Sequence, residues 1–243
     1  TLEHFLPLVA DASGIILCHT KPGVALGEKV NPNRAKHFTN IQDFLAFAAT
    51  QSAAGCDVYF TPAKFKTSKR TKAHAISMKA VWVDLDVRGE AGKGFATSSE
   101  AASSLLAFVA DFKLPSPTIV SSGSGLHAYW VCDTVMTPAE WEPRAAALHA
   151  KIKQFGGDLA ADTARITDSA SMMRLPGFMN HKRGAMATIV YIAKPIPKEQ
   201  FDAFFTVGSS SPAPTTRTPA SAPASALSPP GAPVLGQRPA YLG

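Results

Sequence analysis

Hydrophobic positions along the chain follow two different periods. In residues 41–52 the apolar side chains lie three and four positions apart, which is the spacing of one helix face. Residues 80–86 instead form a short apolar run that is rich in β-branched and aromatic side chains, which predicts a buried strand. The apolar positions of the expected helix are Ile41, Phe44, Leu45 and Ala48.

Capping signals and further apolar runs extend this pattern. Thr97 and Thr137 each begin a Thr-x-x-Glu motif, the form of a capping box, so each predicts a helix start. Residues 118–120, 127–131 and 187–192 have the composition of strands. Because strands and helices interleave, we expect an α/β (α+β) domain with a mixed sheet.

The composition changes sharply near Gly208. From there to Gly243 the chain consists mostly of Pro, Ala, Ser, Thr and Gly, with no acidic residue. Such a segment buries too little apolar surface to offset the entropy that is lost on ordering. We therefore expect one globular domain over residues 1–207 and a disordered Pro/Ala/Ser-rich linker over residues 208–243.

Charge and cysteine content narrow the class of protein. Hydrophobic residues make up 46% of the chain, enough for a sizeable core, and the net charge of +6 favours polyanionic partners. Three cysteines, too widely spaced for a zinc pair and odd in number, indicate reduced thiols and a cytoplasmic protein. No apolar run approaches the roughly 20 residues that span a bilayer, so we expect no membrane partner.

Two aspartates end the expected strand at 80–86. Asp84 and Asp86 are two positions apart, so both project from one face, while Val83 and Leu85 point to the other. Two carboxylates in an apolar strand repel one another unless a cation lies between them. Mg²⁺ and Mn²⁺ prefer such oxygen ligands and bind phosphates at their open positions. The alternative is a strand that ends in solvent, with Asp86 beginning a turn.

A Ser/Gly-rich segment, residues 121–125, lies between two expected strands, shortly before His127. Small residues let backbone N–H groups approach a phosphate, and serine hydroxyls add donors. His127 would begin the next strand and donate a hydrogen bond to a phosphate oxygen. A P-loop is excluded, because no Gly-Lys-Ser/Thr follows. A plain hairpin turn before a half-buried histidine is the alternative.

A third polar region lies further along the chain. Asp158, Asp162 and Asp168 each offer a carboxylate that could complete a two-metal site. Arg174 could clamp a phosphate through two N–H groups, and Lys182 could add a point charge to the same anion. A surface loop with solvated charges is the alternative.

Basic residues are clustered over residues 64–72, and Phe60 and Phe65 lie nearby. Basic and aromatic side chains together suit a nucleic-acid backbone with occasional base stacking, although a solvated loop gives the same pattern. The basic residues are Lys64, Lys66, Lys69, Arg70 and Lys72.

Taken in order, these motifs resemble the archaeo-eukaryotic primase superfamily, in particular the primase-polymerases of phages and plasmids. That family has an acidic pair after an apolar strand, then a Ser-x-His element, then a later aspartate. Here the sequence has Val-Asp-Leu-Asp at 83–86, Ser-Gly-Leu-His-Ala-Tyr-Trp at 124–130 and Arg-Leu-Pro-Gly at 174–177. The resemblance covers about residues 40–190.

The resemblance implies a fold and an activity. The fold is a catalytic core related to the RNA-recognition-motif sheet plus an N-terminal α/β unit, with the active site in the cleft between them. The activity is template-directed nucleotidyl transfer that makes, and in some members extends, primers with two Mg²⁺ or Mn²⁺ ions. The implied partners are nucleoside triphosphates, a single-stranded DNA template with its primer, and a helicase domain beyond the linker. The choice between deoxynucleotides and ribonucleotides stays open.

The resemblance also implies site residues. The family's third aspartate would fall at Thr163, so we favour its neighbour Asp162 and keep Asp158 and Asp168 as alternatives. The expected metal ligands and catalytic residues are Asp84, Asp86 and Asp162, with His127 as a further catalytic residue. The expected nucleotide-binding residues are Ser122, Ser124, Gly125, His127, Arg174 and Lys182.

Two other functions share these residues. A replication-initiation module would use the same fold to bind single-stranded DNA without catalysis, but it gains nothing from a carboxylate pair that faces phosphates. An end-filling repair polymerase would act beside a ligase, and these 243 residues contain no ligase segment.

Overall fold

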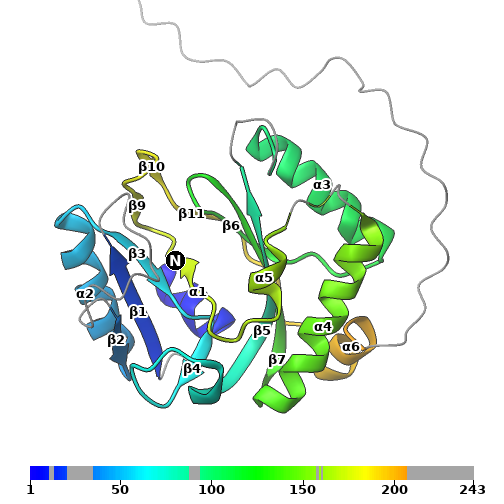
Figure 1. The fold of residues 1–243 in the computed structure, drawn as a ribbon, viewed down its shortest axis with the longest axis horizontal. Helices are drawn as coiled ribbons and strands as arrows, with labels where there is room; N and C mark the ends of the chain where they lie inside the picture. The colour runs from blue at the N-terminus through cyan, green and yellow to red at the C-terminus, as the bar shows by residue number, and fades with distance from the viewer. Residues whose placement is uncertain (11–13, 21–34, 88–93, 157–158, 160, 207–243) are drawn as a thin grey trace, which may run out of the picture. The chain divides into compact units, whose positions relative to one another are not determined.

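The computed structural model describes residues 1–10, 14–20, 35–87, 94–156, 159 and 161–206, all within one compact unit, Thr1–Ser209. The predicted linker at 208–243 and Asp158 lie outside the described residues. Figure 1 shows helices and two larger sheets in this unit. The helices are α1 (Leu2–Val9), α2 (Ile41–Ala53), α3 (Ser98–Asp111), α4 (Pro138–Phe155), α5 (Thr163–Ile166), α6 (Lys198–Phe204) and the 3₁₀ helix η2 (Lys72–His74).

The strands form two larger sheets and one hairpin. The four-stranded sheet, in order, is β2 (Ala35–Phe38), β1 (Ile15–Thr20), β3 (Asp57–Phe60) and β8 (Met173–Arg174). The five-stranded sheet, in order, is β11 (Thr188–Tyr191), β6 (Thr118–Ser121), β7 (Gly125–Met136), β5 (Ala75–Asp86) and β4 (Ala63–Phe65). The hairpin pairs β9 (Met179–Asn180) with β10 (Ala185–Met186).

The predicted α/β (α+β) class is confirmed, and one detail of it differs. Each strand pair that the structure describes within these sheets is antiparallel, whereas we expected a mixed sheet. Parallel pairing is confined, in the described part of the chain, to two isolated bridges, Val87 with Phe95 and Cys132 with Ile196. Short connections explain the difference, since β6 and β7 are joined by three residues, which only antiparallel strands can share.

Two helices begin at the predicted caps. The Thr137 hydroxyl accepts a hydrogen bond from the Glu140 backbone at 3.3 Å, and the Glu140 carboxylate accepts one from the Thr137 backbone at 2.8 Å, a complete capping box. Thr97 caps α3 in the same way, but the Glu100 carboxylate reaches back to the N–H of Ala96. At α3, the backbone hydrogen bond to the glutamate thus comes from the residue before the cap, one position earlier than in a regular capping box.

The two faces of the five-stranded sheet pack against different partners. On one face, Trp130 contacts Phe108 of α3. On the other, Tyr129 contacts Phe5 of α1, and Phe5 also contacts Phe60 of β3. Helix α1 therefore lies between the two sheets (Figure 1) and joins their apolar faces into one core.

Tryptophan side chains fix two helices against β5. Trp141 of α4 stacks on Trp82 with ring centroids 5.0 Å apart, and its Nε1 donates to the Ala80 carbonyl at 2.8 Å. Nε1 of Trp82 donates to the Arg165 carbonyl of α5 at 3.0 Å. Both helices are thus held next to the strand that carries the acidic pair.

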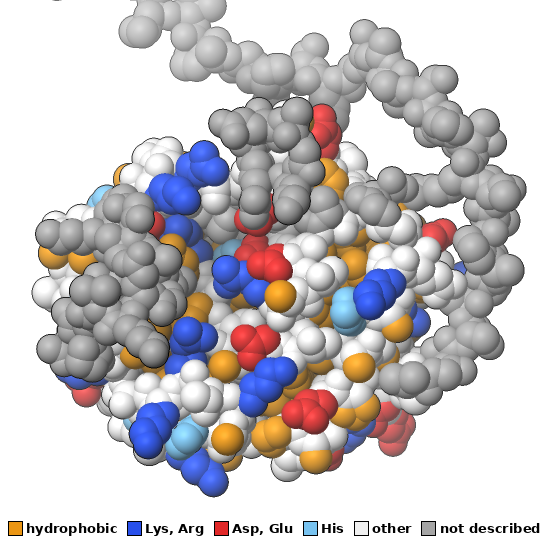
Figure 2. All heavy atoms as spheres, in the orientation of Figure 1, with side chains coloured by type: hydrophobic (Ala, Val, Ile, Leu, Met, Phe, Trp, Pro, Cys, Tyr) orange, Lys and Arg blue, Asp and Glu red, His pale blue; other side chains and the backbone are white. Residues whose placement is uncertain are grey.

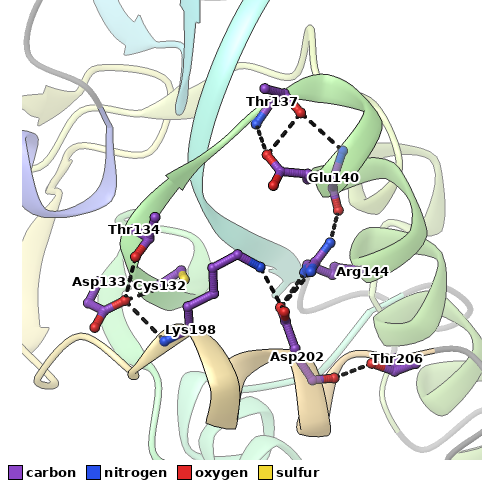
Figure 3. Close-up of polar contacts among 9 residues, drawn as sticks. All are labelled: Cys132, Asp133, Thr134, Thr137, Glu140, Arg144, Lys198, Asp202 and Thr206. Carbon is purple, nitrogen blue, oxygen red and sulfur yellow. Dashed lines mark hydrogen bonds and ion pairs between the residues drawn. The ribbon is translucent and has the colours of Figure 1, made fainter.

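Helix α6 is held by polar contacts, which Figure 3 shows. Asp202 accepts hydrogen bonds from Nε of Arg144 on α4 and from Nζ of Lys198, each at 2.7 Å. Asp133 of β7 accepts from the Lys198 backbone at 3.0 Å. These bonds connect α6 to both α4 and β7.

Two further expectations concern the chain as a whole. None of the described helices combines the length and the apolarity needed to cross a membrane. Cys18, Cys56 and Cys132 are all buried free thiols, as the sequence predicts.

Candidate active site

The acidic pair lies on the β5–β7 ladder. Asp84 is directly opposite His127, and Asp86 is opposite Gly125. Opposed residues share a face of the sheet, and Nε2 of His127 lies 3.5 Å from Oδ1 of Asp84. Val83 and Leu85 are fully buried on the other face, as the alternation predicts.

Asp84 lies in an environment that disfavours its charge. Burial raises the pKa of its carboxyl to about 7, and the neighbouring Asp86 and Asp162 add to this rise. Arg165 and Arg174 act in the opposite direction. A cation beside these carboxylates would favour their ionised forms.

Arg165 of α5 already provides one positive charge at this place. Its Nε lies 2.9 Å from Oδ2 of Asp162 and 3.3 Å from Oδ2 of Asp84, and its NH1 donates to the Met172 carbonyl at 2.7 Å. Burial lowers the pKa of this guanidinium, but Asp84 and Asp162 outweigh burial and raise it. Arg165 is not among the predicted site residues, although its position three residues after Asp162 is typical of a helical ion pair.

The carboxylates of the site provide some, but not all, of the ligands that a divalent ion such as Mg²⁺ needs. Among the described residues, no three His, Cys, Asp or Glu side chains converge closely enough to form a ligand cluster. Mg²⁺, however, is commonly held by one or two carboxylates and takes its other ligands from water and substrate phosphates, which suits Asp84 and Asp86. Asp162 caps α5 and pairs with Arg165, so its role as a third ligand stays a prediction.

His127 is a neutral side chain at physiological pH. Burial lowers the pKa of its imidazole to about 3, and Arg165 and Arg174 lower it further. Its Nδ1 lies 3.4 Å from the hydroxyl of Tyr129, and burial raises the pKa of that phenol, so the hydroxyl keeps its proton. A hydroxyl that donates to Nδ1 leaves the imidazole hydrogen on Nε2, which faces Asp84.

The Ser/Gly turn is held from two sides. The Ser122 backbone N–H donates to the Gly125 carbonyl at 2.9 Å, and Nδ2 of Asn180 donates to the Ser122 carbonyl at 3.0 Å. A side chain at Gly125 would collide with the Leu85 carbonyl, so Gly125 allows β7 to lie close to β5. Gly125 therefore acts through packing at the acidic pair, and its predicted contact with the nucleotide stays untested.

Arg174 lies on β8, in the other sheet from the acidic pair. NH1 lies 3.0 Å from Oδ1 of Asp57, and NH2 donates to Oδ2 of Asp57 at 3.3 Å and to the Tyr59 hydroxyl at 2.9 Å. The guanidinium carbon lies 4.7 Å from the centroid of the Tyr59 ring. Arg174 is only 9% exposed and Asp57 only 2%, so this ion pair is buried.

Most of these groups line one cavity of about 450 Å³. Because Tyr59 and Arg174 come from one sheet and Asp84 and His127 from the other, the cavity lies between the sheets, where we expected the site. Figure 2 shows cationic side chains directly beside acidic ones on this part of the surface. The lining residues are Tyr59, Asp84, Asp86, Val87, Ser122, Ser124, His127, Arg165, Met172, Arg174, Asn180, Lys182 and Arg183.

The lining brings together most of the predicted site. Seven predicted residues are present, while Tyr59, Arg165 and Arg183 were not predicted. The cavity has two carboxylates and four cationic side chains, a balance that suits a polyanion carrying a metal ion. The predicted residues are Asp84, Asp86, Ser122, Ser124, His127, Arg174 and Lys182.

The basic stretch at 64–72 differs from its prediction. Phe60 and Phe65 are buried in the core, so the expectation of base stacking there is wrong. Arg70 donates to the Ala170 carbonyl, and Lys72 donates to the Thr167 carbonyl at 3.1 Å, so both brace a loop. Lys64, Lys66, Lys69 and Lys72 line neither this cavity nor a second one of about 280 Å³, which Arg70, Asp162 and Asp168 do line. Their role in nucleic-acid binding stays a prediction.

Two solved structures have a fold similar to that of this chain. The sequence matches no protein-family model and no curated protein. The structure is similar to the AEP domain of the cyanophage S-2L primase-polymerase, with a TM-score of 0.59 and 18% identity over 84% of this chain and 95% of that one. It is also similar to the primase RepB′, with a TM-score of 0.52 and 16% identity over 84% of this chain and 61% of that one.

Both similar structures are primases, one of them an AEP domain, and the chain has the fold that they share. At 18% and 16% sequence identity, the similarity shows a shared fold and does not show a shared activity. The chain spans nearly all of the cyanophage domain but about three fifths of the RepB′ chain.

Proposed function

We propose that this domain is a template-directed nucleotidyltransferase, a primase or primase-polymerase that uses Mg²⁺ or Mn²⁺. The observation that carries the proposal is the meeting of Asp84, Asp86, His127 and Arg174 in one cavity of a primase fold. One fold can support many activities, so the residues of the site are what indicate this one.

The acidic side would hold the metal. Asp84 and Asp86 are its expected ligands, with Asp162 available if the side chain of Arg165 moves away. A bound divalent ion would activate the attacking hydroxyl and stabilise the leaving pyrophosphate. The neutral His127 would donate its Nε2 hydrogen to a phosphate oxygen, which leaves the charge balance of the site unchanged.

The cationic side would hold the triphosphate. Arg174, Lys182 and Arg183 line the same cavity as the carboxylates, and the hydroxyls of Ser122 and Ser124 add donors. These residues would orient the triphosphate beside Asp84 and Asp86, and positioning of this kind provides much of the rate in phosphoryl transfer. The template and primer would approach from outside the cavity, and the expected helicase partner remains a prediction.

The half-buried carboxylate pair favours catalysis over passive binding. A module that only bound single-stranded DNA would be weakened by Asp84 and Asp86 next to its phosphates. An end-filling repair polymerase would use the same site, so the choice between priming and end filling depends on the template that the enzyme accepts.

Template-directed synthesis tests the proposal directly. With Mg²⁺ or Mn²⁺, a single-stranded template and labelled nucleotides, the wild type should make product. The variant Asp84→Asn/Asp86→Asn keeps the side-chain shapes and loses the charges, and its rate should fall by roughly 100-fold or more.

The matched control is Asp111→Asn, an exposed acidic residue at the end of α3, which should keep the wild-type rate. A double variant that still incorporates nucleotides at the wild-type rate would refute the assigned catalytic site.

A further inference from the structure

Asp57 is a buried carboxylate beneath the cationic side of the cavity. It is 2% exposed and is the first residue of β3, directly before the apolar Val58. It does not line the cavity. An ionised group is costly to bury unless it is well paired, so its partners indicate its role.

Asp57 makes two kinds of contact. It pairs with both terminal nitrogens of Arg174, at 3.0 and 3.3 Å. Its Oδ1 also accepts a hydrogen bond from the backbone N–H of His181, at 2.7 Å. His181 directly precedes Lys182 and Arg183 at the tip of the β9–β10 hairpin, so one carboxylate contacts both cationic elements of the site.

Arg174 keeps donors for a ligand. Guanidinium carries five N–H groups, of which Asp57 and Tyr59 engage only part. Although NH1 lies within ion-pair distance of Asp57, it makes no hydrogen bond to any described residue and is buried. NH1 therefore has no exposed surface for a ligand, and an anion in the cavity would meet the other N–H groups of Arg174, which lines it.

We propose that Asp57 is a positioning residue that fixes the Arg174 guanidinium and the β9–β10 hairpin so that together they bind the triphosphate. The inference rests on the proposed nucleotide site and adds a residue that does not touch the substrate. A guanidinium held on one edge by a carboxylate and over one face by Tyr59 presents its remaining donors in a single orientation.

Three substitutions separate the two contacts of Asp57. Asp57→Asn removes the charge that pairs with Arg174 but keeps an oxygen that can accept from His181. Asp57→Ala removes both contacts. Asp57→Glu keeps the ion pair but moves the guanidinium by one methylene, so it protects the fold while disturbing the position. Asp43→Asn, on the exposed face of α2, is the control.

The readouts are binding of inorganic triphosphate in Mg²⁺ buffer by calorimetry, and KM and kcat for the nucleotide. We expect Asp57→Asn and Asp57→Glu to raise the Kd and KM by about 10-fold, with kcat nearly unchanged, because misplacement weakens binding before chemistry. Asp57→Ala should raise both constants further. Asp57→Asn combined with Arg174→Lys should be no worse than Arg174→Lys alone, since both act through one guanidinium.

Two results would overturn the proposal, and they differ from each other. If Arg174→Lys weakens triphosphate binding while Asp57→Glu binds like the wild type, Asp57 only balances buried charge. If Arg174→Lys also binds like the wild type, the nucleotide site itself is wrongly assigned, and the role of Asp57 falls with it. Should Asp57→Asn fail to fold, Asp57→Glu still decides between these outcomes.

Discussion

The acidic and cationic sides of the cavity are built in different ways. Asp84, Asp86 and His127 lie on two long paired strands, each 12 residues, most of whose side chains are buried in the core. Arg174 lies on a strand of two residues, and Lys182 and Arg183 lie in a hairpin turn.

The side chains on the two sides of the cavity are therefore held in place by different interactions. The acidic side is positioned by backbone hydrogen bonds and core packing. The cationic side is positioned by single side-chain contacts, such as Asp57 with Arg174 and Asn180 with Ser122. Substitutions behind the acidic side should therefore reduce stability most, whereas substitutions on the cationic side should mainly weaken nucleotide binding.

The largest effect should come from Trp141, which supports β5. Trp141→Ala should lower the free energy of unfolding by about 3–5 kcal/mol, because it opens a cavity beside Trp82 and leaves the Ala80 carbonyl without its donor. Urea denaturation measures this. Phe47→Ala on α2, a half-buried position, should cost less than half as much, and equal costs would contradict the contrast.

The next largest effect should come from Gly125. Gly125→Ala places a methyl group against the Leu85 carbonyl, so β5 and β7 must separate at the acidic pair. We expect a loss of about 1–3 kcal/mol and a fall in the incorporation rate of at least roughly 10-fold.

Gly55→Ala is the control for this substitution. Gly55 has a φ of 77° but open space around it, so an added methyl group causes backbone strain without a collision. It should cost about 1 kcal/mol and leave the rate unchanged. A Gly125→Ala enzyme with the wild-type rate would show that the spacing of the strands does not matter to the site.

The same contrast explains which parts the sequence predicts. The apolar run before Asp84 and the capping motif at Thr137 are local signals, and both elements form as predicted. Arg174 was predicted as a site residue, but its ion-pair partner was not. Asp57 lies 117 positions earlier, and no local sequence pattern relates the two. The only hint was a charged residue beginning an apolar strand, at 57–60.

Two other failures have physical causes. Phe60 and Phe65 gave an aromatic-basic pattern because two short strands bury them close in sequence to Lys64 and Lys66, which are less buried. Arg165 was missed because a helix of four residues leaves no periodic signal, and only its spacing from Asp162 indicated an ion pair. Sequence thus predicts the acidic side well and the cationic side only as a list of residues.

A smaller effect on stability should accompany a clear effect on binding at Asn180. Asn180→Ala removes the donor to the Ser122 carbonyl and should cost about 1–2 kcal/mol. Since the Ser/Gly turn loses its support, the KM for the nucleotide should rise by roughly 10-fold. Steady-state kinetics and urea denaturation measure the two quantities.

Asn40→Ala is the matched control, because Asn40 caps α2 through two backbone N–H groups away from the cavity. Its loss should cost about 1 kcal/mol with no change in KM. A KM that rises equally in both variants would mean that stability alone controls binding.

The smallest effect should come from Asp202, which belongs to neither side of the cavity. Burial raises the pKa of its carboxyl, but the hydrogen bonds from Lys198 and Arg144 outweigh burial, so the folded pKa lies below the unfolded value of about 3.9. Asp202 therefore stabilises the fold at every pH above about 4 and loses this contribution as the pH falls through the lower, folded value. Because the carboxylate is partly exposed and screened, Asp202→Asn should cost only about 0.5–1 kcal/mol at pH 7.

Melting temperatures of the wild type and Asp202→Asn should therefore converge toward pH 2. The KM should stay constant, because α6 binds α4 and β7 and contributes no residue to the cavity. Melting temperatures that stay equally separated at pH 2 would mean that the substitution disturbs packing and that the charge of the carboxylate plays no part.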